Sequence, residues 1–159
     1  MAPFNGEARY EIKKRSGNKS ELDGKEYLPS ILKCGHLNHD KDHPDYNNPD
    51  NGMRVTIWQE CAYHMIHQPD PSKIGLSHEH NMRAVRCNMQ DLIDLGYSYD
   101  EVRELIGEAI GLWLEYLGDD MEPQQASICN ETEKEVQTPT VKFVGFKNGE
   151  YKFDFVKDG

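Results

Sequence analysis

The clearest hydrophobic pattern lies between residues 78 and 117, where apolar positions recur every three or four residues. The first stripe predicts a helix over 78–95 and consists of Met82, Val85, Met89, Leu92 and Ile93. A second, longer stripe follows the break at GYSYD and consists of Val102, Leu105, Ile106, Ala109, Ile110, Trp113 and Leu117. Ser98 and Glu101 fit a capping box at its start. The spacing therefore predicts a helical pair over 78–117.

Shorter segments have the composition of strands. RVTIW (54–58) is rich in the β-branched and aromatic residues that favour a pleated surface, and EYLPSILKC (26–34) fits a short strand or turn. QECAYHMIH (59–67) then predicts a short helix. Alternating aromatics flank Asn148-Gly149, the dipeptide favoured in two-residue type I′ turns, which predicts a β-hairpin over 140–158.

These elements predict a single α+β domain over residues 1–159, with a polar N-terminal extension at 1–33. The chain has no run of 18 apolar residues, so no membrane span is expected, and its N-terminus lacks the apolar core of a secretory signal. The four cysteines are widely and irregularly spaced, which does not indicate a disulfide framework. A cytoplasmic location is therefore expected.

The net charge of −10 argues against nonspecific electrostatic binding to nucleic acid. The acidity is concentrated, however, because residues 100–135 carry eleven acidic side chains against only Arg103 and Lys134. The remainder of the chain is almost neutral, so a nucleic-acid partner remains compatible with the charge. The acidic helix expected over 100–122 is instead a candidate surface for a protein partner.

All seven histidines fall between His36 and His80, and three of them lie in GHLNHDKDHPDYNNPDN (35–51). Imidazole is the commonest protein metal ligand and titrates near neutrality, so this clustering indicates a metal or acid–base site. A further pattern, C-x-x-H-x-x-H, lies on the expected helix that follows. It places three candidate ligands on roughly one side of that helix, namely Cys61, His64 and His67.

His39, the Asn47-Asn48-Pro49 run and Asn51 together resemble the pattern of the HNH nuclease family. In that family a histidine is followed by a loop, an asparagine-rich turn, a strand, and a helix with cysteine and histidine. The resemblance covers the candidate metal-binding segment at 34–67. It implies a ββα-metal-like core, to which this chain adds further helices and the C-terminal β-hairpin.

The resemblance also implies a role for individual residues. His39 would take a proton from the attacking water, and Asn51 would brace the loop that orients it. Asn38, with His64 or His67, would bind a divalent cation, magnesium or manganese, that stabilises charge on the phosphate. The implied function is a metal-dependent phosphodiester hydrolase, specifically an HNH-like DNA endonuclease. His36 is an alternative to His39 as the base, although the spacing to Asn51 favours His39.

Two helical nucleotide hydrolases are alternative readings. The segment DPSKIGLSHEHNMRAVRCNMQDLIDL (70–95) resembles part of small phage-type nucleoside-triphosphate pyrophosphatases, with Glu101, Glu104 and Glu108 as magnesium ligands. His39-Asp40 resembles the adjacent metal ligands of HD-type phosphohydrolases, although Pro44 disfavours the helix that this family requires.

A third alternative is a non-catalytic, acidic binding or inhibitor protein that is stabilised by structural zinc. A structural zinc site requires four tight ligands. The sequence offers such a set in Cys34, His36, Cys61 and His64.

Overall fold

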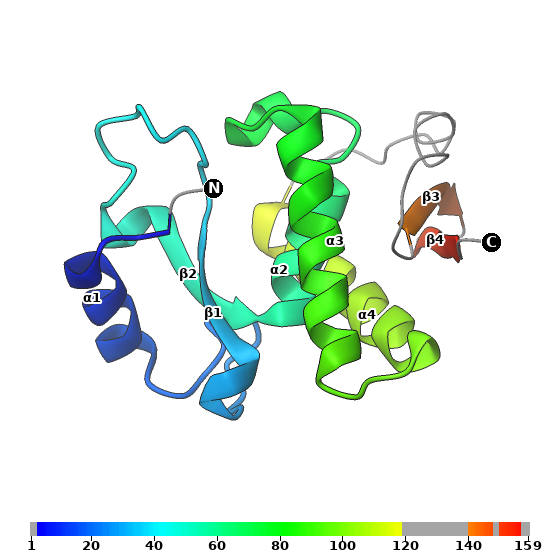
Figure 1. Ribbon diagram of the computed structural model, residues 1–159, viewed down its shortest axis with the longest axis horizontal. Coiled ribbons are helices and arrows are strands. Elements are labelled where there is room, and N and C mark those ends of the chain that lie inside the picture. Colours follow the sequence, from blue (N-terminus) through cyan, green and yellow to red (C-terminus); the bar gives the residue numbers. More distant parts are fainter. Residues whose placement is uncertain (1–2, 119–139, 148–149, 157–159) are drawn as a thin grey trace.

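The computed structural model describes residues 3–118, 140–147 and 150–156 (Figure 1). Its helices and strands are, in chain order, α1 (Gly6–Ser16), β1 (Leu32–His36), β2 (Gly52–Thr56), α2 (Ile57–Ile66), α3 (His78–Asp94), α4 (Tyr99–Leu117), β3 (Thr140–Lys147) and β4 (Glu150–Val156). The expected α+β class is thus confirmed. The order of elements over 32–66 is strand, strand, helix, as the sequence predicts.

The strands β1 and β2 form an antiparallel hairpin in which Leu32 pairs with Thr56 and His36 pairs with Gly52. The chain then passes from β2 directly into α2. The Thr56 hydroxyl accepts a hydrogen bond from the Gln59 backbone amide (3.2 Å), and the Gln59 side chain accepts one from the Thr56 amide (3.0 Å). This capping box starts the helix at Ile57, two residues before the expected start.

The helix α2 is the centre of the main hydrophobic core, and all ten of its residues are buried. It packs against both α3 and α4. The Trp113 indole on α4 also donates a hydrogen bond to the Gln59 carbonyl on α2 (2.7 Å), which ties the two helices together. Any polar side chain on α2 is therefore enclosed by protein and needs a partner.

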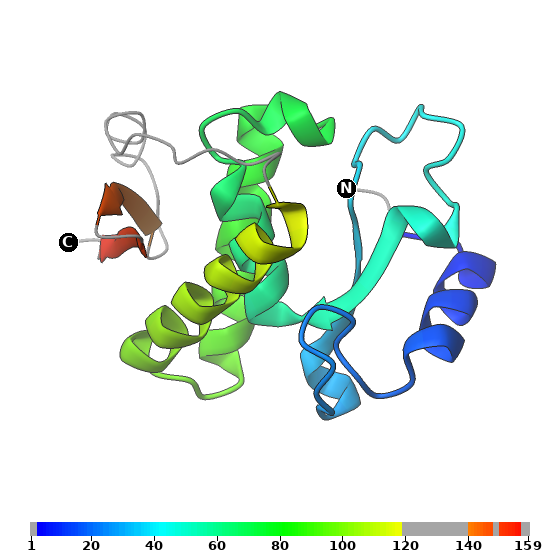
Figure 2. The same cartoon turned by 180° about the vertical axis from the view of Figure 1, so that it is seen from behind.

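A smaller core lies on the other side of the β1–β2 hairpin, where α1 packs (Figure 2). Phe4, Ala8 and Ile12 are buried there, and they pack so closely that a Cβ atom at Gly52 would lie 2.5 Å from Phe4. Segment 1–33 is thus folded onto the domain by an element that the sequence analysis did not assign. Only two of the eleven residues of α1, Ala8 and Ile12, are buried, and these are too few to make a recognisable apolar stripe.

The two helices expected over 78–117 are confirmed as α3 and α4, and the capping box formed by Ser98 and Glu101 begins α4. The strands β3 and β4 are antiparallel partners, which confirms the C-terminal hairpin. Its predicted turn at Asn148-Gly149 lies outside the described residues, as do positions 119–122 of the expected acidic helix. None of the described helices is long and apolar enough to cross a bilayer.

Candidate metal centre

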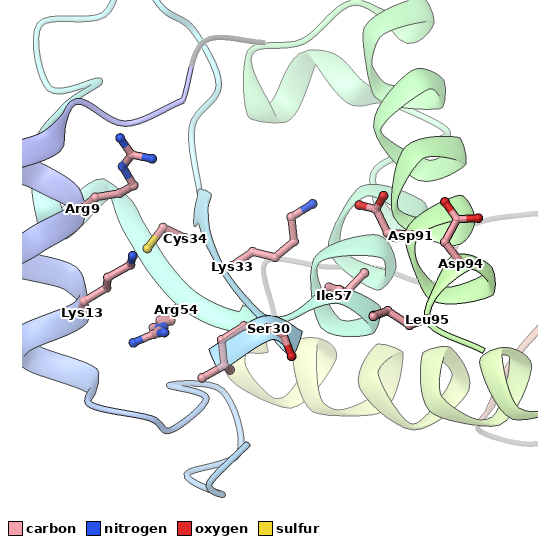
Figure 3. A pocket seen from close by; sticks show the side chains of 11 residues that line it. Arg9, Lys13, Ser30, Lys33, Cys34, Arg54, Ile57, Asp91, Asp94 and Leu95 are labelled. Carbon is pink, nitrogen blue, oxygen red and sulfur yellow. The ribbon is translucent and has the colours of Figure 1, made fainter. Parts of the chain in front are cut away.

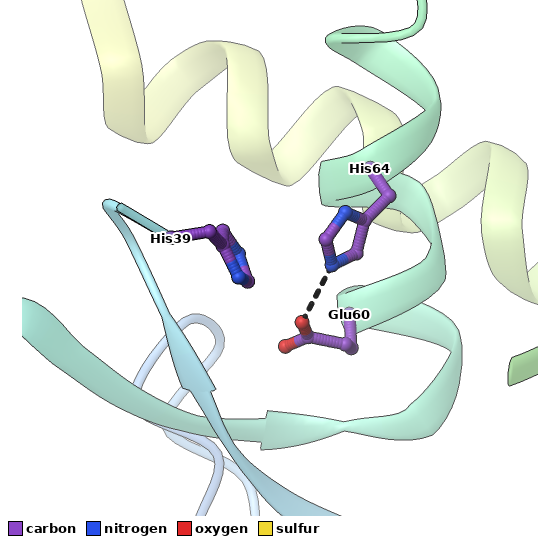
Figure 4. Close-up of side chains that lie close together, drawn as sticks. All are labelled: His39, Glu60 and His64. Atoms are coloured by element: carbon purple, nitrogen blue, oxygen red, sulfur yellow. Dashed lines mark hydrogen bonds and ion pairs between the residues drawn. The ribbon is translucent and has the colours of Figure 1, made fainter. Parts of the chain in front are cut away.

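Three side chains from two segments meet beside the β1–β2 hairpin (Figure 4). Each of His39, Glu60 and His64 offers a ligand atom, and these atoms all lie within 4.8 Å of one another. Within the described part of the chain, no other cluster of three or more His, Cys, Asp or Glu residues meets this distance. His39 follows β1, whereas Glu60 and His64 are one turn apart on α2.

Asn51 holds the loop that carries His39. Its Oδ1 accepts a hydrogen bond from the backbone amide of Asn38 (2.9 Å), and its Nδ2 donates to the Asn38 carbonyl (2.9 Å) and the Tyr46 carbonyl (3.3 Å). The backbone amide of His39 in turn donates to the Ile74 carbonyl (2.7 Å). The main chain immediately before the imidazole is thus fixed by hydrogen bonds from two parts of the chain.

The His39 ring is 7 % exposed, and neither nitrogen makes a hydrogen bond of normal geometry to any described residue. Burial, together with the neighbouring His64, lowers its pKa to about 3. The imidazole is therefore neutral at physiological pH and keeps one free lone pair. A buried polar group without a partner is costly, and such groups in native proteins often mark catalytic or ion-binding positions.

The orientation of His64 is set by Asn81 on α3. The Asn81 Nδ2 donates to the His64 backbone carbonyl (2.9 Å), which leaves the Asn81 Oδ1 to accept from His64 Nδ1 (2.7 Å). The proton of a neutral His64 ring therefore sits on Nδ1, and its lone pair is on Nε2. This nitrogen lies 3.0 Å from Oε1 of Glu60.

Glu60 is also buried, and its carboxylate rests against the backbone of β1. A Cβ atom at Gly35 would lie only 1.9 Å from Oε2 of Glu60, so only glycine leaves room for this carboxylate. Burial tends to raise the Glu60 pKa, but the hydrogen bond and charge of His64 outweigh it, and the net pKa is lowered. With His64 neutral, its Nε2 lone pair would face this carboxylate at 3.0 Å, so the contact needs either a proton, which makes it an ion pair, or a cation between the two atoms.

His36, the alternative base, is outside this cluster. Its ring is stacked between Phe4 and Tyr46, with centroid distances of 3.6 and 4.0 Å. Burial lowers its pKa to about 4. The His36 ring therefore joins α1 to the loop after β1, and its centroid lies 5.7 Å from that of His39.

The four residues suggested for structural zinc do not converge. The Cys61 thiol is buried and donates to the Val85 carbonyl (3.7 Å), while Cys34 packs against the smaller core beside α1. Only His64 of that set belongs to the cluster of ligand atoms.

Two further predicted ligands also lie elsewhere. The Asn38 Oδ1 accepts a hydrogen bond from the Asp40 amide (2.9 Å). The His67 Nδ1 donates to the Tyr63 carbonyl (2.8 Å), as the i, i+4 spacing on α2 allows. Neither residue is needed to complete the cluster.

Glu60 is the member of the cluster that the sequence analysis missed. Its signal was present, since E-x-x-x-H on a helix places both side chains on one face. The C-x-x-H-x-x-H pattern points instead to the i, i+3 spacing of Cys61, His64 and His67. Asn81 carried no comparable signal, because its contact with His64 is made between two different helices.

Glu60 connects the cluster to a neighbouring cavity. This side chain lines a cavity of about 190 Å³ between β1 and α3. The cavity is also lined by three groups that are cationic or become so on protonation, namely Lys33, His80 and Arg83. An anionic ligand could therefore approach Glu60 without crossing an acidic surface.

Comparison of the chain with models of known families, with curated proteins and with solved structures found no match.

Proposed function

We propose that His39, Glu60 and His64 form a divalent-cation centre and that the protein is a metal-dependent phosphodiester hydrolase. The observation that carries this proposal is the pair formed by His64 Nε2 and Glu60 Oε1, 3.0 Å apart, with the unpartnered His39 beside it. A bound cation would be coordinated by both atoms of this pair, His64 Nε2 and Glu60 Oε1. The cation itself, or a water bound to it, would also be the partner that the buried His39 ring lacks.

Glu60 and His64 are the proposed ligands. Metal-ligating histidines usually donate their second ring nitrogen to a neighbouring oxygen, and His64 does so to Asn81. One imidazole and one carboxylate suit Mn²⁺ or Mg²⁺ with further waters better than a closed four-ligand zinc site. The bound cation would supply a Lewis acid that stabilises charge on a phosphate oxygen.

His39 is the proposed general base. Its ring is neutral and has a free lone pair within 4.8 Å of the ligand atoms, so a water held there could give up its proton to His39. Asn51 is a positioning residue, because it holds the backbone that precedes this ring.

An HNH-like DNA endonuclease is the more specific form of the proposal. It is supported by the resemblance over 34–67 and by the order of β1, β2 and α2. Lys33 and Arg83, which line the cavity beside Glu60, provide positive charge suited to a phosphate.

Two measurements test the proposal. Calorimetry should find one Mn²⁺ per chain, and the site should be lost in Glu60→Gln. Nicking of a supercoiled plasmid with Mg²⁺ or Mn²⁺ should be abolished in His39→Ala and retained in His78→Ala, which removes an exposed histidine outside the cluster. Undiminished nicking by Glu60→Gln, or no cation binding by the unaltered protein, would overturn the proposal.

A further inference from the structure

A second and larger cavity lies on the other side of β1, between α1 and α3 (Figure 3). Its volume is about 560 Å³, which is within the range of small-molecule sites. None of the three donors of the candidate metal centre lines it. Lys33 lines both this cavity and the smaller one beside Glu60, so the two cavities adjoin at this side chain.

One wall of the larger cavity is cationic. Arg9 and Lys13 are one turn apart on α1, and neither side chain makes an ion pair or hydrogen bond with any residue the structure describes. Arg54 on β2 is buried; it donates through Nη1 to the Gly17 carbonyl (2.6 Å), and its Nε is without a partner in the described part of the chain. Three basic groups from two elements therefore line this cavity, and none of them forms an ion pair with an acidic residue in the described part of the chain.

The opposite wall is acidic and comes from α3. Asp91 and Asp94 face the cavity across β1 (Figure 3). The surface between the walls is partly apolar, and it includes Leu95, which is 50 % exposed although it is a large aliphatic residue. A ligand that complements these walls would have an anionic end, an apolar middle and hydrogen-bond donors at its far end.

We propose that this cavity binds one nucleotide of the substrate, with its phosphate at Arg9 and Lys13 and an amino-bearing base edge at Asp91 and Asp94. Charge-assisted hydrogen bonds would form at both ends, and the base would lie against Leu95. Lys33 would contact the next phosphate toward Glu60. The choice of a nucleotide over other ligands with these two ends rests on the proposed phosphodiester chemistry.

The acidic wall makes the inference specific. Adenine, guanine and cytosine carry an exocyclic amino group that can donate to a carboxylate, whereas thymine lacks one. The cavity should therefore bind oligodeoxycytidylate more tightly than oligothymidylate of the same length. A merely electrostatic surface would bind the two probes equally, because their phosphates are identical.

The test is equilibrium binding of fluorescent oligodeoxycytidylate and oligothymidylate to the full chain in EDTA at low salt. Arg9→Ala with Lys13→Ala should weaken both probes by about tenfold. The matched control, Lys14→Ala with Lys19→Ala, removes two exposed lysines that do not line the cavity and should cost far less. Equal losses in the two double variants would overturn the inference.

Substitution of the acidic wall gives a second test, in which a base contact and simple charge repulsion predict affinity changes of opposite sign for oligodeoxycytidylate. Asp91→Ala with Asp94→Ala should reduce the affinity for oligodeoxycytidylate to that for oligothymidylate. If the carboxylates only repel phosphate, both probes will instead bind more tightly, as they should in the control Glu104→Ala with Glu108→Ala on α4. That result would refute the base contact. Mononucleotides, CMP against TMP, would show whether a free nucleotide is sufficient or a strand is required.

The experiment separates this inference from the proposed function. Glu60→Gln should leave the preference for oligodeoxycytidylate over oligothymidylate unchanged, because binding is measured without a divalent cation and Glu60 does not line the larger cavity. Nucleotide binding with normal base preference but no cation binding would overturn the metal centre alone. Cation binding without any preference between the probes would overturn the nucleotide cavity alone.

Discussion

Asn51→Ala should destabilise the protein far more than the same substitution at Asn48, three residues earlier. The Asn51 side chain makes three hydrogen bonds to backbone groups of Asn38 and Tyr46, at sequence separations of 13 and 5. The Asn48 side chain makes one local hydrogen bond, to the exposed Asp50 amide (2.9 Å). The pair therefore compares one residue type, in one loop, with long-range and local contacts.

The magnitude follows from the number of bonds lost. A hydrogen bond contributes about 1 kcal/mol net, and partly buried backbone groups left without partners cost more. Asn51→Ala should thus lower the free energy of unfolding by about 3 kcal/mol, whereas Asn48→Ala should lower it by about 1 kcal/mol. For a domain of this size, the larger loss corresponds to a fall in Tm of about 10 °C.

Urea denaturation followed by tryptophan fluorescence would measure both losses, because Trp58 and Trp113 lie in the main core. An unchanged slope of free energy against urea would show that the denatured states are comparable. Equal losses at the two positions would refute the reasoning, since they would mean that the long-range bonds of Asn51 contribute nothing. Undiminished plasmid nicking by folded Asn51→Ala would separately refute its role in placing the proposed base His39.

Three further predictions follow from the site. Gly35→Ala should abolish Mn²⁺ binding in calorimetry while leaving the fold intact, because its Cβ would displace only the end of the Glu60 side chain. The control Gly111→Ala, with no described atom near its Cβ, should preserve Mn²⁺ binding and stabilise α4 by up to about 1 kcal/mol. Asn81→Ala should weaken Mn²⁺ binding by about 10- to 100-fold relative to the unaltered chain, and full retention would contradict its role in orienting His64. As the pH is lowered from 6.5 to about 4, the free energy of unfolding of the cation-free protein should fall, because His36 and His39 bind protons in the unfolded chain at a higher pH than in the folded chain. His36→Phe should make the urea midpoint less dependent on pH. An identical pH dependence in this variant would contradict the lowered pKa of His36.

The sequence predicted α3 and α4 well because one face of each is packed and the other is wet, so burial leaves a regular stripe. The sequence predicted the start of α2 two residues too far along the chain, because α2 is buried on every side and so shows no regular apolar stripe. Ile57 and Trp58 have strand composition, yet both are buried on a helix that the capping box of Thr56 begins. Tertiary burial here outweighed intrinsic β-propensity.

The candidate site was predictable only in part. The density of histidine pointed to the region in which the candidate cluster lies, and the structure bonds Asn51 to Asn38, the residue before His39. Which of the histidines meet depended on the crossing of the loop over α2, which no local pattern encodes. Glu60 was overlooked because a charged residue is normally on the wet side of a helix, and α2 has no wet side.

Because α2 is completely buried, the entropy lost by its side chains when a cation binds should be small. Glu60 and His64 lie on a helix whose backbone can open only when α3 and α4 separate from it, so these two donors are ordered before any ion arrives. Hydrogen exchange at the α2 amides should accordingly require global unfolding. Cation binding then carries little ordering cost at its two ligands, and the remaining freedom of the centre lies with the proposed base His39, whose loop Asn51 holds.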